Sequence, residues 1–167
     1  MTATLLGIII ESGNLTWTTT LAEALPQIRN MSSGHRNTTL AMLAAHRSGI
    51  AGEVKPKYPT LWKKLYESQL QPVVGRQLVA QQVLEVPPDL APNTSWNYSN
   101  SNYMILGHII DQQGSSWEEA IKSKLWTPLG MTECGFGNPP ESSETAIENP
   151  WPHISSRFDP QPPLSQS

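Results

Sequence analysis

Apolar residues recur at helical spacing along most of the first 137 residues, and no stretch alternates between apolar and polar residues as a half-buried strand does. The spacing predicts a helix over residues 2–12, which holds the longest apolar run, residues 5–10, and ends at the C-cap Gly13. Because its apolar residues lie on most faces, we expect this helix to be buried at the centre of the fold.

Six further helical segments are predicted from apolar periodicity and from residues that start or stop helices. Asn37 or Thr38 is expected to cap the segment that starts at residue 39, and Thr60 the one that follows. Ser115 and Glu118 are expected to form a capping box for the last. The six segments cover residues 20–25, 39–47, 61–69, 72–86, 101–113 and 117–126. The chain is therefore predicted to be mainly α.

Residues 138–167 differ in composition from the rest of the chain. Pro, Ser and Glu dominate there, and no helical period remains. A chain of 167 residues is long enough for one domain with a sizeable core. We therefore expect a folded helical region over residues 1–137 and an irregular tail over residues 138–167.

Charge and composition narrow the classes of function. The net charge is −3, with no basic stripe, so nucleic acid is not an expected partner. The longest apolar run is too short to span a bilayer, and no signal peptide is visible, so the compartment stays open. Five N-x-Ser/Thr sequons permit secretion without showing it. The single Cys134 excludes an internal disulfide and has no zinc-ligand spacing.

A search for self-sufficient catalytic sets finds no G-x-S-x-G, H-E-x-x-H or G-x-x-x-x-G-K motif. The four histidines are scattered, so we expect no metal site, and no cofactor is indicated. His46 and Ser48 could be a base and a nucleophile. We favour a polar helix end, where His46 and Arg47 interact with the negative end of the helix dipole.

The polar segment before residue 101 is the best candidate site. Tyr98 and Asn100 lie two residues apart at the start of a predicted helix, where a phenol could move a proton and an amide could orient a substrate. Trp96, beside them, is a candidate substrate-binding platform. The structural alternative is that Tyr98 packs against the fold and Asn100 is an N-cap.

Four segments, in order, resemble the serine β-lactamase-related family, which includes class C β-lactamases, penicillin-binding DD-peptidases and esterases. Residues 2–17 resemble its nucleophile-bearing helix, and residues 38–50 its helix ending in H-x-S-G-[LI]. Tyr98-Ser99-Asn100, with the helix up to residue 110, resembles its Y-x-N segment. Residues 125–132 resemble its [IL]-[FW]-x-P-L-G-M segment.

The resemblance implies the α/β β-lactamase/transpeptidase-like fold, of which residues 1–137 would form the helical region without most of the antiparallel sheet. It also implies acyl-enzyme chemistry on a small-molecule or peptide amide or ester. In the family, a Ser and a Lys one helical turn apart, as S-x-x-K, supply the nucleophile and its base. Tyr98 would share the proton, and Asn100 would hold the Lys and the substrate amide.

The chain departs from the family pattern at two places. It contains no S-x-x-K, the nearest approach being Ser33 with Arg36, and no K-T-G or H-x-G. In relatives the S-x-x-K precedes the segment matched by residues 2–17. We therefore expect a fragment of a serine hydrolase that is inactive alone. The alternatives are a degenerate, non-catalytic member of the family and a helical module that binds a ligand or a partner protein.

Overall fold

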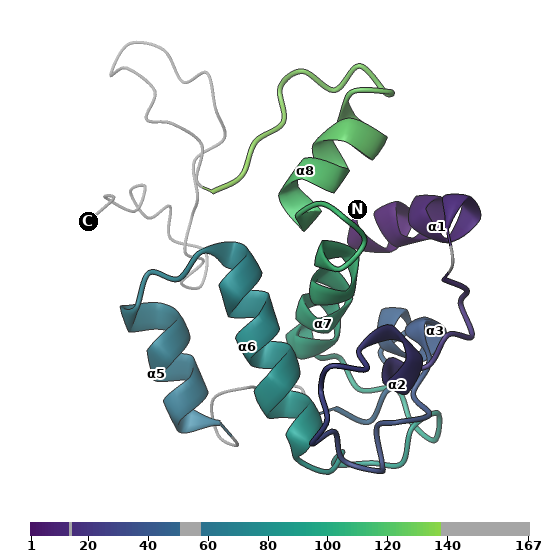
Figure 1. Ribbon diagram of the computed structural model, residues 1–167, viewed down its shortest axis with the longest axis vertical. Helices are drawn as coiled ribbons and strands as arrows, with labels where there is room; N and C mark the ends of the chain where they lie inside the picture. Colours follow the sequence, from purple (N-terminus) through teal and green to yellow (C-terminus); the bar gives the residue numbers. More distant parts are fainter. Residues whose placement is uncertain (14, 51–57, 138–167) are drawn as a thin grey trace, which may run out of the picture. The chain divides into compact units, whose positions relative to one another are not determined.

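The structure is a computed structural model that describes residues 1–13, 15–50 and 58–137. This part of the chain is helical, and apart from one isolated antiparallel bridge between Thr20 and Thr39 it contains no strand (Figure 1). The expected mainly α fold is confirmed. The expected irregular tail, residues 138–167, lies outside the described residues.

The chain divides into two compact units, Met1–Gly130 and Met131–Ser167. The first contains every helix of the described residues. Of the second, residues 131–137 are described, and they contain bends but no helix or strand. No helix within the described ranges is both long and apolar enough to cross a membrane.

Helix α1, Thr2–Ser12, has the bounds that the sequence predicts, with Gly13 as its C-cap. Its buried residues are Leu5, Leu6 and Ile9, and it contacts α7, α8 and η1. The expectation that it is buried on most faces is wrong, since its other apolar side chains are partly exposed or exposed.

Two short helices follow. Helix α2, Leu21–Ala24, begins at a capping box in which Thr20 and Glu23 bond reciprocally. Helix α3, Leu40–Ala44, is capped by Thr39, whose hydroxyl accepts from the Met42 amide. The expected caps Asn37 and Thr38 are therefore wrong. Thr38 is instead fully buried in the turn before the helix, where its amide bonds to the His35 carbonyl. Helix α3 is also shorter than predicted, because His46 takes a left-handed backbone conformation with φ 55°.

Helices α5, Pro59–Glu67, and α6, Pro72–Glu85, both have proline in the first turn and pack together. Helix α6 agrees with the prediction, whereas α5 begins one residue before its expected cap Thr60, with Tyr58 as the N-cap. The buried residues of α6 are Gly75, Val79, Ala80, Val83 and Leu84.

Helix α7, Asn100–Asp111, is the centre of the first unit and contacts α1, α3, α6 and α8. Figure 1 shows it running alongside α6, in the middle of the helical part. Leu106, Ile109 and Ile110 of this helix are fully buried. Tyr103 is partly exposed.

The last predicted helix is two elements, the α-helix α8, Trp117–Ile121, and the π-helix η1, Lys122–Trp126. Its capping box is formed by Ser116 and Glu119, not by Ser115 and Glu118. Glu118 is unavailable for a cap because its carboxylate bonds to Arg76, on α6.

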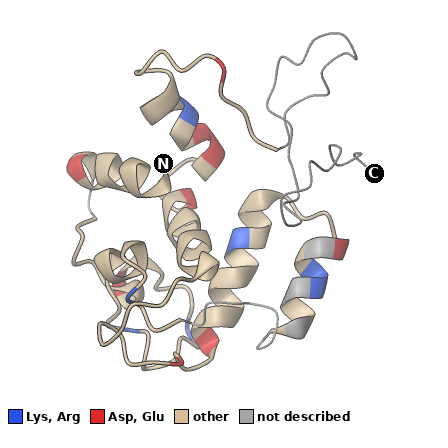
Figure 2. Cartoon of the chain, turned by 180° about the vertical axis from the view of Figure 1, so that it is seen from behind, with Lys and Arg blue, Asp and Glu red and all other residues tan. Residues whose placement is uncertain are grey.

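Arg76 joins three helices. Its guanidinium donates to both carboxylate oxygens of Asp111, at 2.8 and 2.9 Å, and to both of Glu118, at 2.7 and 2.8 Å. Asp111 also accepts from the backbone amide of Trp117, at 2.7 Å, so it fixes the start of α8. Bidentate pairs of this kind are strong and directional. Charges elsewhere in the described part are scattered over several helices, with no stripe of one sign (Figure 2).

The Arg76 side chain lies flat on α7 because residue 107 is glycine. A Cβ at Gly107 would be 2.6 Å from Cδ of Arg76. Burial opposes the charge of Arg76, but its hydrogen bonds to Glu118 and Asp111 outweigh burial and raise the pKa of the guanidinium. The same hydrogen bonds hold the pKa of Glu118 below its usual value. Arg76 and Glu118 are therefore both charged throughout the physiological pH range.

Replacing Arg76 by Gln is expected to lower the free energy of unfolding by about 3 kcal/mol, because Asp111, only 2% exposed, loses its counter-ion. Urea unfolding measures the change. The matched control is Lys63→Gln, which breaks an exposed pair with Glu67 and should cost under about 0.5 kcal/mol. Equal effects of the two substitutions would show that the buried cluster does not stabilise the fold.

His108, 3% exposed in α7, gives the fold a dependence on pH. Burial lowers the pKa of its imidazole; Asp111 opposes the shift and Arg76 adds to it. The unfolded chain therefore takes up this proton first, and stability present above about pH 6.5 is lost as pH falls toward the folded pKa. His108→Leu should remove that loss, measured by urea unfolding at about pH 7.5 and about pH 5. A wild-type and variant difference that is constant with pH would contradict this.

Candidate functional site

Tyr98 and Asn100, the two candidate catalytic residues, are brought together at the entrance of α7. The Tyr98 hydroxyl donates to Oδ1 of Asn100, at 3.1 Å. Both residues are exposed, Tyr98 by 54%, and Trp96 beside them is 64% exposed. The structural alternative is wrong for Asn100, since Ser99 is the N-cap of α7. The Tyr98 ring does contact the fold, at His46, while more than half of its surface stays exposed. A phenol and an amide thus meet on an open surface.

The imidazole of His46 lies among three aromatic rings. Its centroid is 4.6 Å from that of Tyr98, with a 38° tilt, and 5.2 Å from that of Tyr103, to which it stacks at 29°. Trp96 meets the imidazole edge-on at 6.2 Å. These separations are in the range of favourable aromatic contacts. His46 is thus the point at which the end of α3 meets the Tyr98 segment.

Hydrogen bonds fix how the His46 ring is turned. Its Nδ1 accepts from the backbone amide of Ser99, at 3.2 Å, and lies 3.3 Å from Nδ2 of Asn102. Since both neighbours are donors, Nδ1 must be unprotonated, and the proton of the neutral ring is on Nε2. The ring therefore holds the first turn of α7 through its acceptor and the Tyr98 ring through its face.

Ser48 is a structural residue. It is 1% exposed, and its hydroxyl donates to Oδ1 of the fully buried Asn102, at 2.7 Å. The Ser48 hydroxyl oxygen in turn accepts from the Ile50 amide, at 3.2 Å. His46 and Ser48 are not bonded to each other in this arrangement but are linked through the two ends of the Asn102 amide. A pairing of His46 and Ser48 as base and nucleophile finds no support in this geometry.

Main-chain hydrogen bonds also join the residues after α3 to the segment before Tyr98. The His46 carbonyl accepts from the Asn97 amide, at 2.9 Å, and the Arg47 carbonyl accepts from the Asn93 amide, at 2.7 Å. The Arg47 side chain also bonds to Asn93, through Nε and one terminal nitrogen. The interpretation of Arg47 as a partner of the helix dipole is thus replaced by a specific bond to a loop 46 residues away.

Gly49 completes the turn. Its φ of 75° lies in the left-handed region, and a Cβ here would be 2.0 Å from the Leu90 carbonyl oxygen. The Gly49 carbonyl accepts from the amides of Asp89 and Leu90. A side chain at residue 49 would therefore push apart the two segments that build the site.

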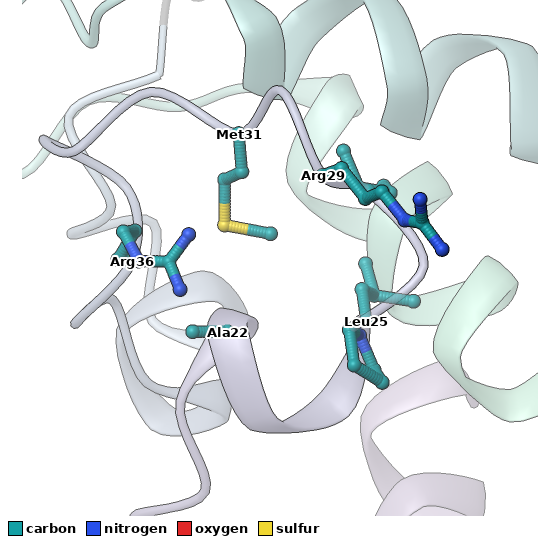
Figure 3. A pocket seen from close by; sticks show the side chains of 7 residues that line it. Ala22, Leu25, Arg29, Met31 and Arg36 are labelled. Carbon is teal, nitrogen blue, oxygen red and sulfur yellow. The ribbon is translucent and has the colours of Figure 1, made fainter.

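A separate cavity of about 240 Å³ lies beside α2, and its lining residues are Ala22, Leu25, Pro26, Ile28, Arg29, Met31 and Arg36. In Figure 3, Arg29 and Arg36 lie on opposite sides of the cavity, and the Arg29 guanidinium is directed away from Arg36. The two positive groups therefore do not converge on one anion. None of the candidate site residues lines this cavity.

The part of the chain that the structure describes holds no cluster of three His, Cys, Asp or Glu side chains arranged to bind a metal. The groups exposed together at the Tyr98 surface are a phenol, an amide and an indole. Such groups can relay a proton and orient a carbonyl compound. They do not include a nucleophile activated by a base.

The sequence indicates Tyr98 and Asn100 as candidates, but it does not show which residues hold them in place. His46 and Asn102 are at least 50 residues apart along the chain, and their contact depends on the tertiary fold. The sequence signal for these anchors is the H-x-S-G segment. Its histidine and serine were expected to be a base and a nucleophile or a polar helix end, and they instead hold the Y-x-N segment in place.

The sequence of this chain is similar to those of known proteins. The sequence model described as Beta-lactamase matches residues 1–165. Penicillin-binding protein 4 of Amycolatopsis lactamdurans is 31% identical over 135 residues, which are 78% of this chain and 32% of that protein. The chain thus spans about a third of the length of this curated relative.

Solved structures share the fold of the helical part. A D-stereospecific amidohydrolase from Streptomyces sp. is similar with a TM-score of 0.58 and 29% identity, over 77% of this chain and 39% of that one. A penicillin-binding protein homologue from Caulobacter crescentus has a TM-score of 0.58 at 16% identity, over 77% and 32% of the two chains. The described helices are therefore the helical region of a larger fold that these proteins share.

Replacing Asn102 by Ala is expected to lower the free energy of unfolding by about 1–3 kcal/mol, because the buried Ser48 hydroxyl loses its acceptor. Chemical denaturation provides the measurement. Asn100→Ala serves as the matched control: the same substitution two residues earlier, at an exposed position, should change stability by less than about 0.5 kcal/mol. Comparable losses in the two variants would contradict the anchoring role of Asn102.

Proposed function

The chain belongs to the β-lactamase family of serine hydrolases, which includes penicillin-binding proteins, and from this premise we propose that its Tyr98–Asn100 pair is part of an acyl-transfer site. The observation that carries the proposal is the hydrogen bond from the exposed Tyr98 hydroxyl to Oδ1 of Asn100, at the start of α7. This pair lies in the Y-x-N segment and is open to a substrate.

The proposed reaction needs a serine whose hydroxyl loses its proton as it attacks a carbonyl carbon. The bond from that carbon to the leaving nitrogen or oxygen then breaks, the leaving group takes up a proton, and water hydrolyses the ester that remains on the serine. Tyr98 would relay the proton between the serine and the leaving group. Asn100 would orient the lysine that serves as the base and the substrate amide, and Trp96 would form one wall for the substrate.

The nucleophile and its base must come from outside these 167 residues, which contain no S-x-x-K. We therefore propose that the chain supplies the Tyr and Asn side of the site and is inactive by itself. The substrate class is a small-molecule or peptide amide or ester, which fits the similarity to an amidohydrolase and to penicillin-binding proteins.

The missing S-x-x-K also favours a second candidate function, a non-catalytic member of the family that binds a ligand through the same exposed surface. The two functions differ in one respect that can be measured. In the first, the Tyr98 phenol takes part in bond formation once a Ser–Lys pair is present, whereas in the second it contributes to binding alone.

Neither a fluorescent penicillin nor a fluorophosphonate is expected to label the 167-residue chain covalently. Residues 1–130, placed in a penicillin-reactive relative instead of its matching region, should restore labelling. Tyr98→Phe in that chimera should slow acylation by about 10²–10⁴-fold, the usual contribution of a proton-transfer group. Gel fluorescence against time provides the rates.

Tyr103→Phe is the matched control for the chimera. It removes a phenol that bonds to the Ala44 carbonyl, not to Asn100, and it should leave the acylation rate unchanged. Labelling of the isolated chain would overturn the proposed inactivity. A chimera that binds the penicillin and acylates equally fast with Tyr98→Phe would instead support the binding function.

A further inference from the structure

His46 contacts both the backbone and the side chain of the Tyr98 segment. Its Nδ1 accepts from the Ser99 amide, and its ring faces the Tyr98 ring with centroids 4.6 Å apart. The two contacts use different parts of one imidazole, an in-plane lone pair and a π face. A residue that provides both can set the position of residue 98 and the direction of its phenol together.

Tyr98 depends on such a support. More than half of its surface is exposed, so burial does not hold the ring in one orientation. The hydroxyl bonds to Asn100, which is itself exposed. The contact that links Tyr98 to the rigid part of the fold is therefore the one to His46.

His46 is itself firmly placed. Its carbonyl bonds to the Asn97 amide, and its ring stacks on the ring of Tyr103. On its other edge, Nδ1 faces Asn102, which is fully buried and held by Ser48. Displacing the ring would break contacts with α7 and with the end of α3.

We infer that His46 is a positioning residue of the site, which fixes the direction of the Tyr98 phenol through its Nδ1 acceptor and its ring face. This inference rests on the proposed role of Tyr98. The group that reacts is the phenol, and His46 acts through it without touching substrate. A neutral ring with its proton on Nε2 is required, because a proton on Nδ1 would face the amide hydrogen of Ser99.

Two substitutions separate the parts of the imidazole. In His46→Asn the side-chain oxygen replaces Nδ1 as an acceptor, and asparagine tolerates the φ of 55° found here. In His46→Phe a ring remains and the acceptor is lost. Arg47→Gln is the neighbouring control, since it removes the bonds to Asn93 and leaves the imidazole in place.

The experiment uses the whole 167-residue chain labelled with 3-fluorotyrosine. ¹⁹F NMR then reports the surroundings of each of the four tyrosines, and Tyr98→Phe assigns the Tyr98 signal. His46→Asn is expected to move that signal toward the value of a free tyrosine while the Ser99 amide stays protected from hydrogen exchange. His46→Phe should keep the ring contact but speed exchange of the Ser99 amide by about tenfold.

Arg47→Gln should leave the Tyr98 fluorine signal and Ser99 exchange as in the wild type. A Tyr98 signal that is unchanged by both His46 substitutions would overturn the inference. So would an equal shift in Arg47→Gln, because the effect would then belong to the turn as a whole. The readout needs no activity, so failure of the acylation experiment with the chimera and failure here are distinguishable.

Discussion

The arrangement of the helices depends on a single guanidinium. Arg76 leaves α6, crosses α7 above Gly107, and ends between Asp111 and Glu118, so one side chain fixes three helices relative to each other. Asp111 also accepts a hydrogen bond from the Trp117 amide, so the start of α8 is fixed relative to Arg76. Apolar packing alone allows neighbouring helices to slide, whereas two bidentate pairs tolerate little displacement. With α7 fixed at its C-terminal end, its N-terminal end can present residues to solvent in a defined place.

At that N-terminal end a second, weaker set of contacts performs the same task for the candidate site. His46, Ser48 and Asn102 form a hydrogen-bonded network. The Ser48 hydroxyl donates to Oδ1 of Asn102, Nδ2 of Asn102 lies beside Nδ1 of His46, and Nδ1 accepts from the Ser99 amide. Unlike the Arg76 cluster, this network contains no carboxylate or guanidinium, and it holds a polar turn in place of a second helix. The result is an ordered surface on which the Tyr98 phenol and Asn100 amide are exposed together.

Local signals predicted elements whose ends depend on local chemistry. Helix α6 begins at Pro72, as expected from the fixed φ of proline, and α1 ends at Ser12, with Gly13 as its C-cap. The start of α8, by contrast, cannot be predicted from local sequence. Ser115 with Glu118 and Ser116 with Glu119 are both possible capping boxes, and the choice between them is made by Arg76, which is more than 40 residues away and occupies Glu118. In the same way the sequence indicated Tyr98 and Asn100, but not the ring of His46 behind them.

The bonds from Asp89 and Leu90 to the Gly49 carbonyl have a consequence for how this fold can vary. Because these bonds join residue 49 to residues 89 and 90, residues 50–88 form one long closed segment whose two ends lie together. Lengthening a closed loop costs little, about 0.6 kcal/mol of chain entropy for each doubling. Helix α5 lies in this closed segment, before the position of Arg76. Insertions near α5 can therefore be accommodated while the turn that carries Tyr98 stays in register.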